Sequence, residues 1–361
     1  MTQPAIDSTL NCLPNPTTLV EPQDIYYMGL AIEQARQGLL TTRPNPAVGC
    51  VIVKDNEIVG QGFHPKAGQP HAEVFALRQA ADKAKDACAY VTLEPCSHTG
   101  RTPPCARALI AAKIKRVVIA GLDPNPEVSG QGVTLLRQAG IEVVVGVLQL
   151  EAEALNLGFL KAMRTGLPYV RLKIATSLDG RSAMSSGESK WITGSAARAD
   201  VQRLRAQSAA IITGSQTIID DNPELNVRSA SLGVSLEDII QPKIIILDRR
   251  LRLDASSSYT ACQYSQTLFW RDDDLIKLLR HLVIDYQFYD ILVEAGAQVV
   301  GSFIKEGLID ELVIYQAPCL LGNSARPMAH FNIDHLNEQC RFRYQSFQNL
   351  GPDIKLILTA F

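Results

Sequence analysis

The stretch that decides the fold of the first half of the chain is HAEVFALRQAADKAKDACAYVTLEPCSHTGRTPPC, residues 71–105. It contains one imidazole and two thiols at His71, Cys96 and Cys105. These residue types bind a tetrahedral Zn²⁺ and leave its fourth position open for water, which is the arrangement of a catalytic zinc rather than a structural one. We therefore predict a catalytic zinc site with these three residues as its ligands.

Glu73 stands two residues after the histidine and is not needed as a ligand. Such a carboxylate can take a proton from zinc-bound water and deliver it to a leaving amine, which is the chemistry of the nucleobase deaminases and of their H-x-E…P-C-x-x-C pattern. The alternative is a structural zinc knuckle, or two ordinary buried cysteines. A structural site would need a fourth protein ligand and would not need Glu73, so we prefer the catalytic interpretation.

The residues around the ligands predict a helix, a strand and a second helix. Residues 72–81 have helical composition and spacing, residues 89–93 form a buried apolar strand, and Pro103-Pro104 precedes a helix that begins at Cys105. All three ligands are therefore expected at or near helix N-termini. Both the helix dipole and the metal favour thiolates there.

Length and composition limit the possible classes of protein. A chain of 361 residues exceeds the size of one ordinary core, so we expect two domains. Its 46% hydrophobic and 20% charged content describes a soluble globular protein, and a net charge of −2 gives no footprint for nucleic acid or an acidic membrane. No apolar run approaches the roughly 20 residues of a membrane helix. Eight unclustered cysteines and no signal segment predict a cytoplasmic protein.

The rest of the first half alternates strands and helices. Residues 1–21 resemble an unstructured leader, and Asp24 is expected to cap a helix over 24–35. Strands over 48–53 and 58–63 form a hairpin. After Cys105 we expect a helix to 112, a strand at 116–120, a helix at 132–138 and a strand at 141–147. This alternation predicts an α/β layered sheet with helices on both faces.

Asn45 lies between Pro44 and Pro46, which restrict its backbone. An amide fixed in this way can recognise the donor and acceptor edge of a pyrimidine. Asn in a proline-rich turn is as often only a turn former, and the local sequence leaves both interpretations open.

Five motifs together resemble one family, the bifunctional deaminase-reductases of riboflavin biosynthesis. They are Pro44-Asn45-Pro46 with Val48-Gly49, His71-Ala72-Glu73, Glu94-Pro95-Cys96-Ser97-His98, Gly100-Arg101-Thr102-Pro103-Pro104-Cys105 and Asp123-Pro124-Asn125-Pro126. The eight residues between Cys96 and Cys105 depart from the short C-x-x-C of cytidine and tRNA adenosine deaminases and fit this family instead. The resemblance implies a cytidine-deaminase-like three-layer domain followed by a dihydrofolate-reductase-like α/β domain.

The same resemblance implies the two reactions and the first set of contacts. The first domain would deaminate 2,5-diamino-6-ribosylamino-4(3H)-pyrimidinone 5′-phosphate, and the second would reduce its ribosyl group to ribityl with NADPH. Asn45 and His64 would contact the pyrimidine or ribose, and His98, Arg101 and Thr102 would hold the phosphate. Arg101 beside a helix N-terminus suits an anion, whereas His98 taken alone would be an ordinary loop histidine.

The second half is again predicted to be α/β. We expect a helix over 151–158 and a boundary turn over 163–168, which divides the chain into domains at 22–166 and 167–361. Strands are expected at 169–175, 209–213, 242–247, 290–293, 311–316, 342–347 and 353–360, with helices at 198–207, 274–282 and 299–306.

The cofactor site of this half is harder to find because the chain has no G-x-G-x-x-G. The strand, small-residue turn and helix over 291–302 could seat a pyrophosphate, although such a turn is usually only a tight connection. The resemblance extends to the segments 177–181, 189–193, 214–217, 220–225 and 294–296. It implies nucleotide contacts at Ala175, Trp191, Thr217, Asp221, Arg249, Gly296, Ala297, Gln298, Val299, Val300, Gly301 and Ser302, and substrate contacts at Ser189, Arg205, Leu225, Arg228 and Glu294.

Two interpretations in this half stay open. Lys173 and Glu294, at strand ends, are candidates for the pair that protonates or polarises the sugar oxygen, and a structural ion pair is the alternative. Arg249 follows the strand 242–247 and could recognise the 2′-phosphate of NADPH, or it could be only solvated.

Two other classes of protein are less consistent with the sequence. A zinc cytidine or tRNA deaminase with a non-catalytic C-terminal binding module is disfavoured by the long gap between Cys96 and Cys105 and by the absence of a basic patch. A non-enzymatic zinc protein is disfavoured by Glu73. The partners we expect are the phosphorylated ribosylaminopyrimidine substrate and a second copy of the chain in a homo-oligomer, with neither nucleic acid nor membrane.

Overall fold

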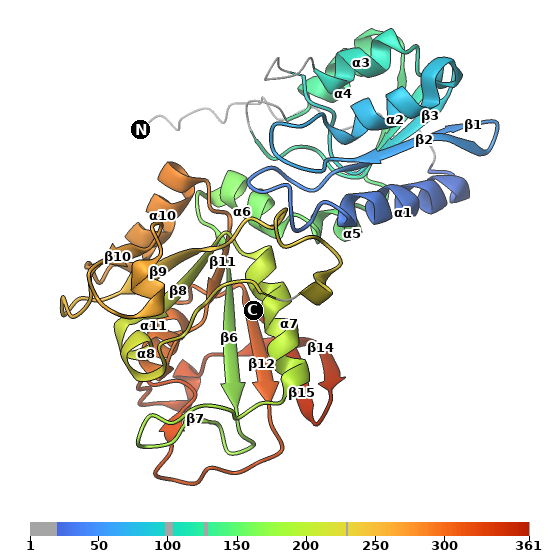
Figure 1. The fold of residues 1–361 in the computed structure, drawn as a ribbon. Coiled ribbons are helices and arrows are strands. Elements are labelled where there is room, and N and C mark those ends of the chain that lie inside the picture. Colours follow the sequence, from blue (N-terminus) through green and yellow to red (C-terminus); the bar gives the residue numbers. More distant parts are fainter. Residues whose placement is uncertain (1–19, 98–103, 126–128, 229, 361) are drawn as a thin grey trace, which may run out of the picture.

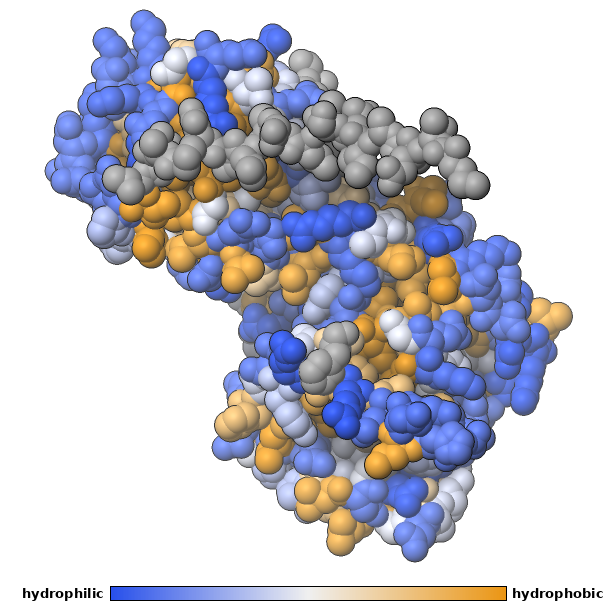
Figure 2. Space-filling model, turned by 180° about the vertical axis from the view of Figure 1, so that it is seen from behind, coloured by the Kyte–Doolittle hydropathy of each residue, from blue (hydrophilic) through white to orange (hydrophobic). Residues whose placement is uncertain are grey.

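A computed structural model describes residues 20–97, 104–125, 129–228 and 230–360 as two lobes, one for each half of the chain (Figure 1). The predicted leader lies almost wholly outside these residues. In the space-filling view polar and apolar residues are interspersed on the face of both lobes that is seen (Figure 2). Among the described helices, none is long and apolar enough to cross a membrane.

The first lobe is built on a five-stranded sheet in the order β2-β1-β3-β4-β5. The strands are β1 (Gly49–Lys54), β2 (Glu57–Phe63), β3 (Cys88–Val91), β4 (Arg116–Ile119) and β5 (Glu142–Val145). β1 is antiparallel to β2 and to β3, whereas β3, β4 and β5 run parallel. The predicted hairpin and the predicted alternation of strands and helices are both confirmed.

Helices cover both faces of this sheet because both faces of its strands are apolar. Cys50 and Ile52 face a core shared with α2 (Ala72–Ala80), α3 (Cys105–Ala111) and α4 (Gln131–Gln138). Val51 and Val53 face the opposite core, shared with α1 (Pro22–Arg36) and α5 (Gln149–Glu153). Side chains that alternate along each strand thus fill two layers of core. The result is the predicted three-layer domain.

The prediction that Asp24 caps the first helix is confirmed only in part, because Asp24 closes a capping box with Glu21 but is not the N-cap itself. α1 begins at Pro22 with Glu21 as its N-cap, and the Asp24 side chain accepts from the Glu21 backbone N–H at 2.9 Å. Asp24 is buried and forms an ion pair with Arg116 of β4, Nη1 to Oδ1, at 2.6 Å. Pro22 suits the first helical position because it has no N–H to leave unpaired. Asp24 therefore joins the helix to the sheet.

The second lobe contains an eight-stranded sheet in the order β10-β9-β8-β11-β6-β12-β15-β14. Its strands are β6 (Tyr169–Thr176), β8 (Ala210–Gly214), β9 (Lys243–Leu247), β10 (Leu268–Trp270), β11 (Asp290–Val293), β12 (Glu311–Gln316), β14 (Phe342–Leu350) and β15 (Asp353–Ala360). The strands from β10 to β12 are parallel, and β15 and β14 add an antiparallel edge. β7 (Arg181–Ala183) and β13 (Arg326–Pro327) form a separate two-stranded sheet.

Two helical layers cover the second sheet as well. α10 (Leu275–Tyr286) and α11 (Ala297–Lys305) pack on one face, against Val170, Leu172 and Ile174 of β6. α7 (Ser195–Gln207), α8 (Ser215–Asp221) and α9 (Thr260–Gln263) pack on the other face. The carboxyl ends of the parallel strands therefore meet at one edge, where open α/β sheets bind ligands.

The connection between the lobes differs from the prediction. In place of one helix over 151–158 and a turn over 163–168, α5 is followed by α6 (Leu157–Thr165), and the turn begins only at Gly166, where φ is +71°. Helix-forming residues continue to the glycine, which ends α6 because it accepts this conformation without strain. α6 packs against β6 and β11 of the second lobe. The domain boundary at 166/167 stays a prediction.

The close packing of α1 on β1 gives a test of the first lobe. A Cβ at Gly49 would lie 2.0 Å from the Ala31 carbonyl oxygen of α1, whereas a Cβ at Gly29 of α1 would meet nothing within 4 Å. We expect Gly49→Ala to destabilise the domain by about 1–3 kcal/mol and to lower its thermal midpoint by roughly 3–10 °C. Gly29→Ala should raise the midpoint or leave it, since alanine is the better helix former. An unchanged midpoint for Gly49→Ala would contradict the described contact.

Candidate functional site

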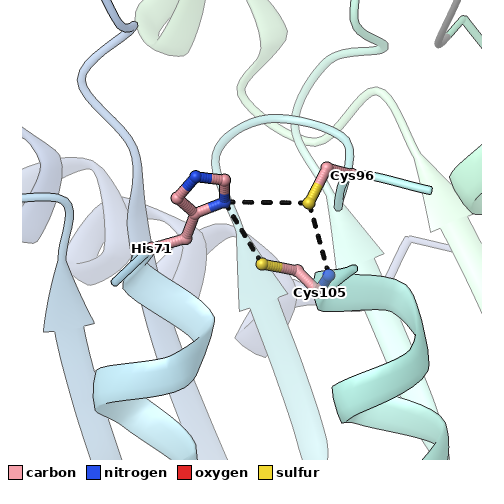
Figure 3. A group of neighbouring side chains, drawn as sticks. All are labelled: His71, Cys96 and Cys105. Atoms are coloured by element: carbon pink, nitrogen blue, oxygen red, sulfur yellow. Dashed lines mark hydrogen bonds between the residues drawn. The ribbon is translucent and has the colours of Figure 1, made fainter. Parts of the chain in front are cut away.

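His71, Cys96 and Cys105 meet at one end of the first sheet (Figure 3). His71 is the N-cap of α2, Cys105 is the first residue of α3, and Cys96 lies in the loop that follows β3. The His71 Nδ1 atom lies 3.3 Å from Cys105 Sγ and 3.7 Å from Cys96 Sγ.

These separations suit a zinc ion. With bonds of about 2.0–2.1 Å to nitrogen and 2.3 Å to sulfur, tetrahedral ligand atoms lie roughly 3.4–3.8 Å apart. Within the part of the chain that the structure describes, no further His, Cys, Asp or Glu joins the group. Three protein ligands leave one position for a water or a substrate atom, as the residue types predicted.

The surroundings stabilise a thiolate at Cys96. The Cys105 thiol and, at 3.3 Å, the Cys105 backbone N–H donate to Cys96 Sγ, and these bonds together with His71 lower the pKa of Cys96. The hydrogen bond with Cys96 raises the pKa of His71 in turn. Cys96 itself stands in a loop, near a helix N-terminus rather than at one. The first N–H of α3 nevertheless points at its sulfur, which supplies the expected helix dipole.

Glu73 lies beside the three ligands in the first turn of α2. Its side chain is 3% exposed, it bonds with Cys105, and its Oε2 atom has no hydrogen-bond partner among the described residues. Burial, together with the nearby Cys96 sulfur, raises the pKa of Glu73 to about 7. A buried carboxyl with one oxygen unpaired can both accept and release a proton near neutral pH.

Glu94 is a supporting residue that the sequence analysis did not assign. Its Oε1 accepts from the N–H groups of Gly132 and Val133 at 2.9 and 3.2 Å, and its Oε2 accepts from those of Asp123 and Gly130 at 3.2 and 3.0 Å. The carboxylate thereby satisfies the first turn of α4 and fixes the chain two residues before Cys96. In the sequence Glu94 is noticeable only as a carboxylate directly before Pro95. The N–H groups that it accepts from lie up to nearly 40 residues further along the chain, so its role could not be predicted locally.

Asn45 and His64 lie together next to the metal ligands. His64 Nδ1 lies 3.1 Å from the Pro70 carbonyl oxygen, which can only accept, so Nδ1 carries the hydrogen and donates. His64 Nε2 then accepts from Asn45 Nδ2 at 3.0 Å, and burial lowers the pKa of His64 and favours this neutral form. The His64 ring packs edge-on against His71, with centroids 5.2 Å apart. The amide of Asn45 is therefore oriented with Oδ1 left to accept a further hydrogen bond.

Three residues of the predicted phosphate site fall outside the described residues. They are His98, Arg101 and Thr102.

The second group of site residues lies near the carboxyl end of β11. Glu294 accepts from Arg205 of α7 through both oxygens, at 2.8 and 3.0 Å, and Lys173 Nζ of β6 lies 3.5 Å from Glu294 Oε1. Burial alone would raise the pKa of Glu294, but Arg205 and Lys173 outweigh it and hold the pKa at about 2. Glu294 is therefore ionised at neutral pH and cannot donate a proton.

The predicted nucleotide contacts gather at the same edge of the sheet. The Gly296 N–H donates to Thr217 Oγ1 at 3.1 Å, which joins the turn after β11 to α8. Ser189 donates to Asp221 Oδ1 at 3.0 Å, and Trp191 is exposed with the Arg198 guanidinium 4.4 Å over its ring. These contacts bring segments around 190, 217 and 296 together, as the resemblance requires.

The other predicted contact residues of the second domain take no part in the contacts described above. Val300 and Gly301 belong to the buried face of α11. The backbone N–H groups that α11 could offer a pyrophosphate are those of its first turn, at Ala297, Gln298 and Val299, because these have no partner within the helix. Ser302 lies further along the same helix and bonds with Gln298. Ala175 lies on the same face of β6 as Lys173, Leu225 is buried, and Arg228 pairs with Glu224 at the surface.

Arg249 makes one weak contact, whereas Arg252 bonds with the start of α8, the helix that carries the predicted nucleotide contacts Thr217 and Asp221. The Arg249 side chain is 69% exposed and approaches Asp273 at 3.5 Å. Arg252 donates to Ser215 Oγ at 2.7 Å and to Gln216 Oε1 at 2.6 Å, in the first turn of α8. Arg252 escaped the sequence analysis because nothing local distinguishes it from its neighbour Arg250.

Comparison with known proteins agrees with this division of the chain. Residues 21–121 match the family profile "Cytidine and deoxycytidylate deaminase zinc-binding region", and residues 168–356 match "RibD C-terminal domain". The riboflavin biosynthesis protein RibD of Escherichia coli is 47% identical over 94% of this chain and all of its own length.

Two solved structures are similar over 94% of the chain. That of Acinetobacter baumannii RibD has a TM-score of 0.89 at 52% identity, covering 94% of this chain and 99% of that one. A diaminohydroxyphosphoribosylaminopyrimidine deaminase/5-amino-6-(5-phosphoribosylamino)uracil reductase of Thermotoga maritima has a TM-score of 0.85 at 32% identity, with the same coverage.

The metal centre can be tested through its thiol ligands. We expect the purified chain to hold one zinc ion, and Cys105→Ser to lose it, since the remaining two ligands bind zinc weakly. Cys262→Ser is the matched control, because Cys262 is also a buried free thiol but lies in the core of the second lobe. Zinc content by atomic emission is the measurement. Equal zinc in the parent and in Cys105→Ser would contradict the assigned ligands.

Proposed function

The chain belongs to the RibD family of riboflavin-biosynthesis proteins, and from that membership we propose which of its residues carry the family's two reactions. The protein is a bifunctional enzyme. Its zinc-dependent first domain deaminates 2,5-diamino-6-ribosylamino-4(3H)-pyrimidinone 5′-phosphate, and its second domain reduces the ribosyl side chain to ribityl with NADPH. The alternative of a non-catalytic second half is not favoured, because that half matches the RibD C-terminal domain.

For deamination we assign zinc binding to His71, Cys96 and Cys105. When bound, the ion supplies a water whose pKa is low enough to give a hydroxide nucleophile near neutral pH. Glu73 accepts the proton that this water loses and carries it to the amine as it leaves. The observation that supports this role is the buried, unpaired Oε2 of Glu73 in the turn after His71.

Substrate positioning is assigned to Asn45. Its Oδ1 faces outward from the His64 contact and can accept from an amino or ring N–H of the pyrimidine, while His64 fixes the direction of the amide. The phosphate contacts at His98, Arg101 and Thr102 are carried over from the family resemblance alone.

For reduction we assign the proton donor to Lys173. NADPH supplies the hydride when it is bound. The Lys173 ammonium polarises and then protonates the sugar oxygen, and Glu294 and Arg205 hold Lys173 in place and contact the substrate. The sequence analysis named Lys173 and Glu294 together as the pair for this step, and within that pair the proton is assigned to Lys173 because Glu294 stays ionised with a pKa of about 2.

Self-association and location are proposed on separate observations. β14 is an edge strand whose Tyr344 and Phe347 side chains are 69% and 80% exposed, and a second copy of the chain could cover them. The seven cysteines within the described residues are free thiols, which suits a cytoplasmic enzyme.

Glu73→Gln tests the deaminase assignment. The amide keeps the size of the side chain but cannot accept a proton, so ammonia release should fall by roughly 10²–10⁴-fold. Zinc content should stay at the parental level, and NADPH oxidation with supplied deaminated substrate should be unchanged. Parental ammonia release by Glu73→Gln would show that Glu73 does not transfer the proton. A parallel loss of reduction would show that the two reactions are not separable.

A comparison of Arg249→Ala with Arg252→Ala tests which arginine recognises the 2′-phosphate of NADPH. The resemblance implies Arg249, but the contacts of Arg252 with α8 make it the better candidate. Losing a hydrogen bond to a charged group costs about 1.5–3 kcal/mol, so Arg252→Ala should raise the NADPH KM roughly 10- to 150-fold and leave NADH almost unaffected. Arg249→Ala should change the NADPH KM less than threefold. The reverse pattern in steady-state kinetics would show that Arg249, and not Arg252, recognises the 2′-phosphate.

A further inference from the structure

The segment that carries Asn45 is the place where the two domains meet. Residues 37–48 connect α1 to β1, and we call them the docking loop. It belongs to the deaminase half in sequence. Three of its residues are nevertheless attached to the reductase half or to a helix that packs on it.

The first attachment is apolar. Leu40 is 6% exposed and lies in a cluster with Ala206 of α7 and with Val227, Leu232 and Ile239. All of these partners come from the second domain. Burial of Leu40 in this cluster stabilises the loop only when the domains are docked.

The second attachment is polar. The Arg43 guanidinium donates to the backbone oxygens of Ser208 and Ile240, the latter at 2.7 Å. Ser208 is the C-cap of α7, so a cation there also meets the negative end of the helix dipole. Arg43 is two residues before Asn45.

The third attachment lies two residues after Asn45. The Ala47 N–H donates to Asn156 Oδ1 at 2.7 Å, and Asn156 Nδ2 donates back to the Ala47 oxygen at 2.9 Å. Asn156 is the N-cap of α6, which is held on the second domain by the Lys161–Asp310 ion pair at 2.6 Å and by the packing of Phe159 on Tyr289.

The space behind the loop is open. A cavity of about 380 Å³ separates the domains here, and its walls include Asn45 and Pro46 from the first domain and Lys243, Tyr289 and Asp290 from the second. Within its own domain the loop is held by Thr41, which donates to the Pro65 oxygen at 2.5 Å, and by the contact of Asn45 with His64. Two residues before Asn45 the loop is therefore attached to the reductase half through Arg43, and two residues after it the loop is attached through Asn156 to α6, which packs on that half.

We propose that the reductase domain positions Asn45 for deamination, with Leu40, Arg43 and Asn156 acting as positioning residues. They touch neither substrate nor metal, and they act by fixing the loop on which the pyrimidine contact stands. The inference rests on the substrate-binding role proposed for Asn45. It means that the deaminase site is complete only when the two domains are docked.

The test is deaminase kinetics on the full chain with Arg43→Met and, separately, Asn156→Ala. Each should raise the KM for the diaminopyrimidine substrate roughly 5- to 30-fold, with a smaller change in kcat, because the loop is loosened while Glu73 and the metal ligands are untouched. Zinc content and the thermal midpoint of the first domain monitor folding. Arg36→Gln is the matched control, since Arg36 lines the same cavity but, among the described residues, forms its ion pair with Glu33 of its own helix, and it should keep the parental KM.

A double-mutant cycle with Asn45→Ala separates positioning from general stability. If Arg43 acts through Asn45, adding Arg43→Met to Asn45→Ala should raise KM little further. Full additivity, or a parental KM for both Arg43→Met and Asn156→Ala beside an impaired Asn45→Ala, would overturn this inference and leave the proposed function standing. A parental KM for Asn45→Ala itself would overturn the assigned role of Asn45 and this inference with it.

Discussion

The first domain depends on holding two sulfur atoms and one imidazole nitrogen within 4.8 Å of one another at the end of a sheet. Thiols and an imidazole brought this close share hydrogens when no metal is present, and a divalent cation replaces those hydrogens with bonds. The surrounding elements serve this arrangement. α2 and α3 direct their N-termini to it, β3 delivers the Cys96 loop, and Glu94 secures that loop by satisfying the start of α4.

The reductase site is organised by charge pairing rather than by a metal. Glu294, which directly follows β11, is held ionised between Arg205 of α7 and Lys173 of β6. Charges that are removed from water are stable only when they are paired, and the carboxylate therefore fixes both cations in a defined geometry. Arg205 also ties α7 to the sheet, and Ser208, the C-cap at the same end of α7, accepts from Arg43 of the docking loop. One helix thus links the reductase site to the edge of the deaminase domain.

Local sequence was enough to predict much of this fold. The hairpin, the parallel strands and the helices at Ala72 and Cys105 followed from apolar spacing and prolines, and the zinc ligands followed from residue types with well-known chemistry. Errors arose where distant residues decide the outcome. Asp24 is an internal partner of Arg116, 92 residues away, and Glu94 caps a helix that begins at Gln131, so neither role is visible locally. α6 continues to Gly166 because the first residue able to end it stands there. Arg252 differs from the neighbouring arginines only in its tertiary contacts with the start of α8.

Whether one chain carries both activities can be measured in a single reaction that contains the full chain, the diaminopyrimidine ribosylphosphate and NADPH. Ammonia and NADPH are followed together in it. The two-domain enzyme described here should release one ammonia for each NADPH oxidised. After removal of zinc by a chelator, ammonia release should cease, whereas NADPH oxidation with supplied deaminated substrate should continue. Release of ammonia without any NADPH oxidation, or undiminished ammonia release by the zinc-free protein, would contradict the account.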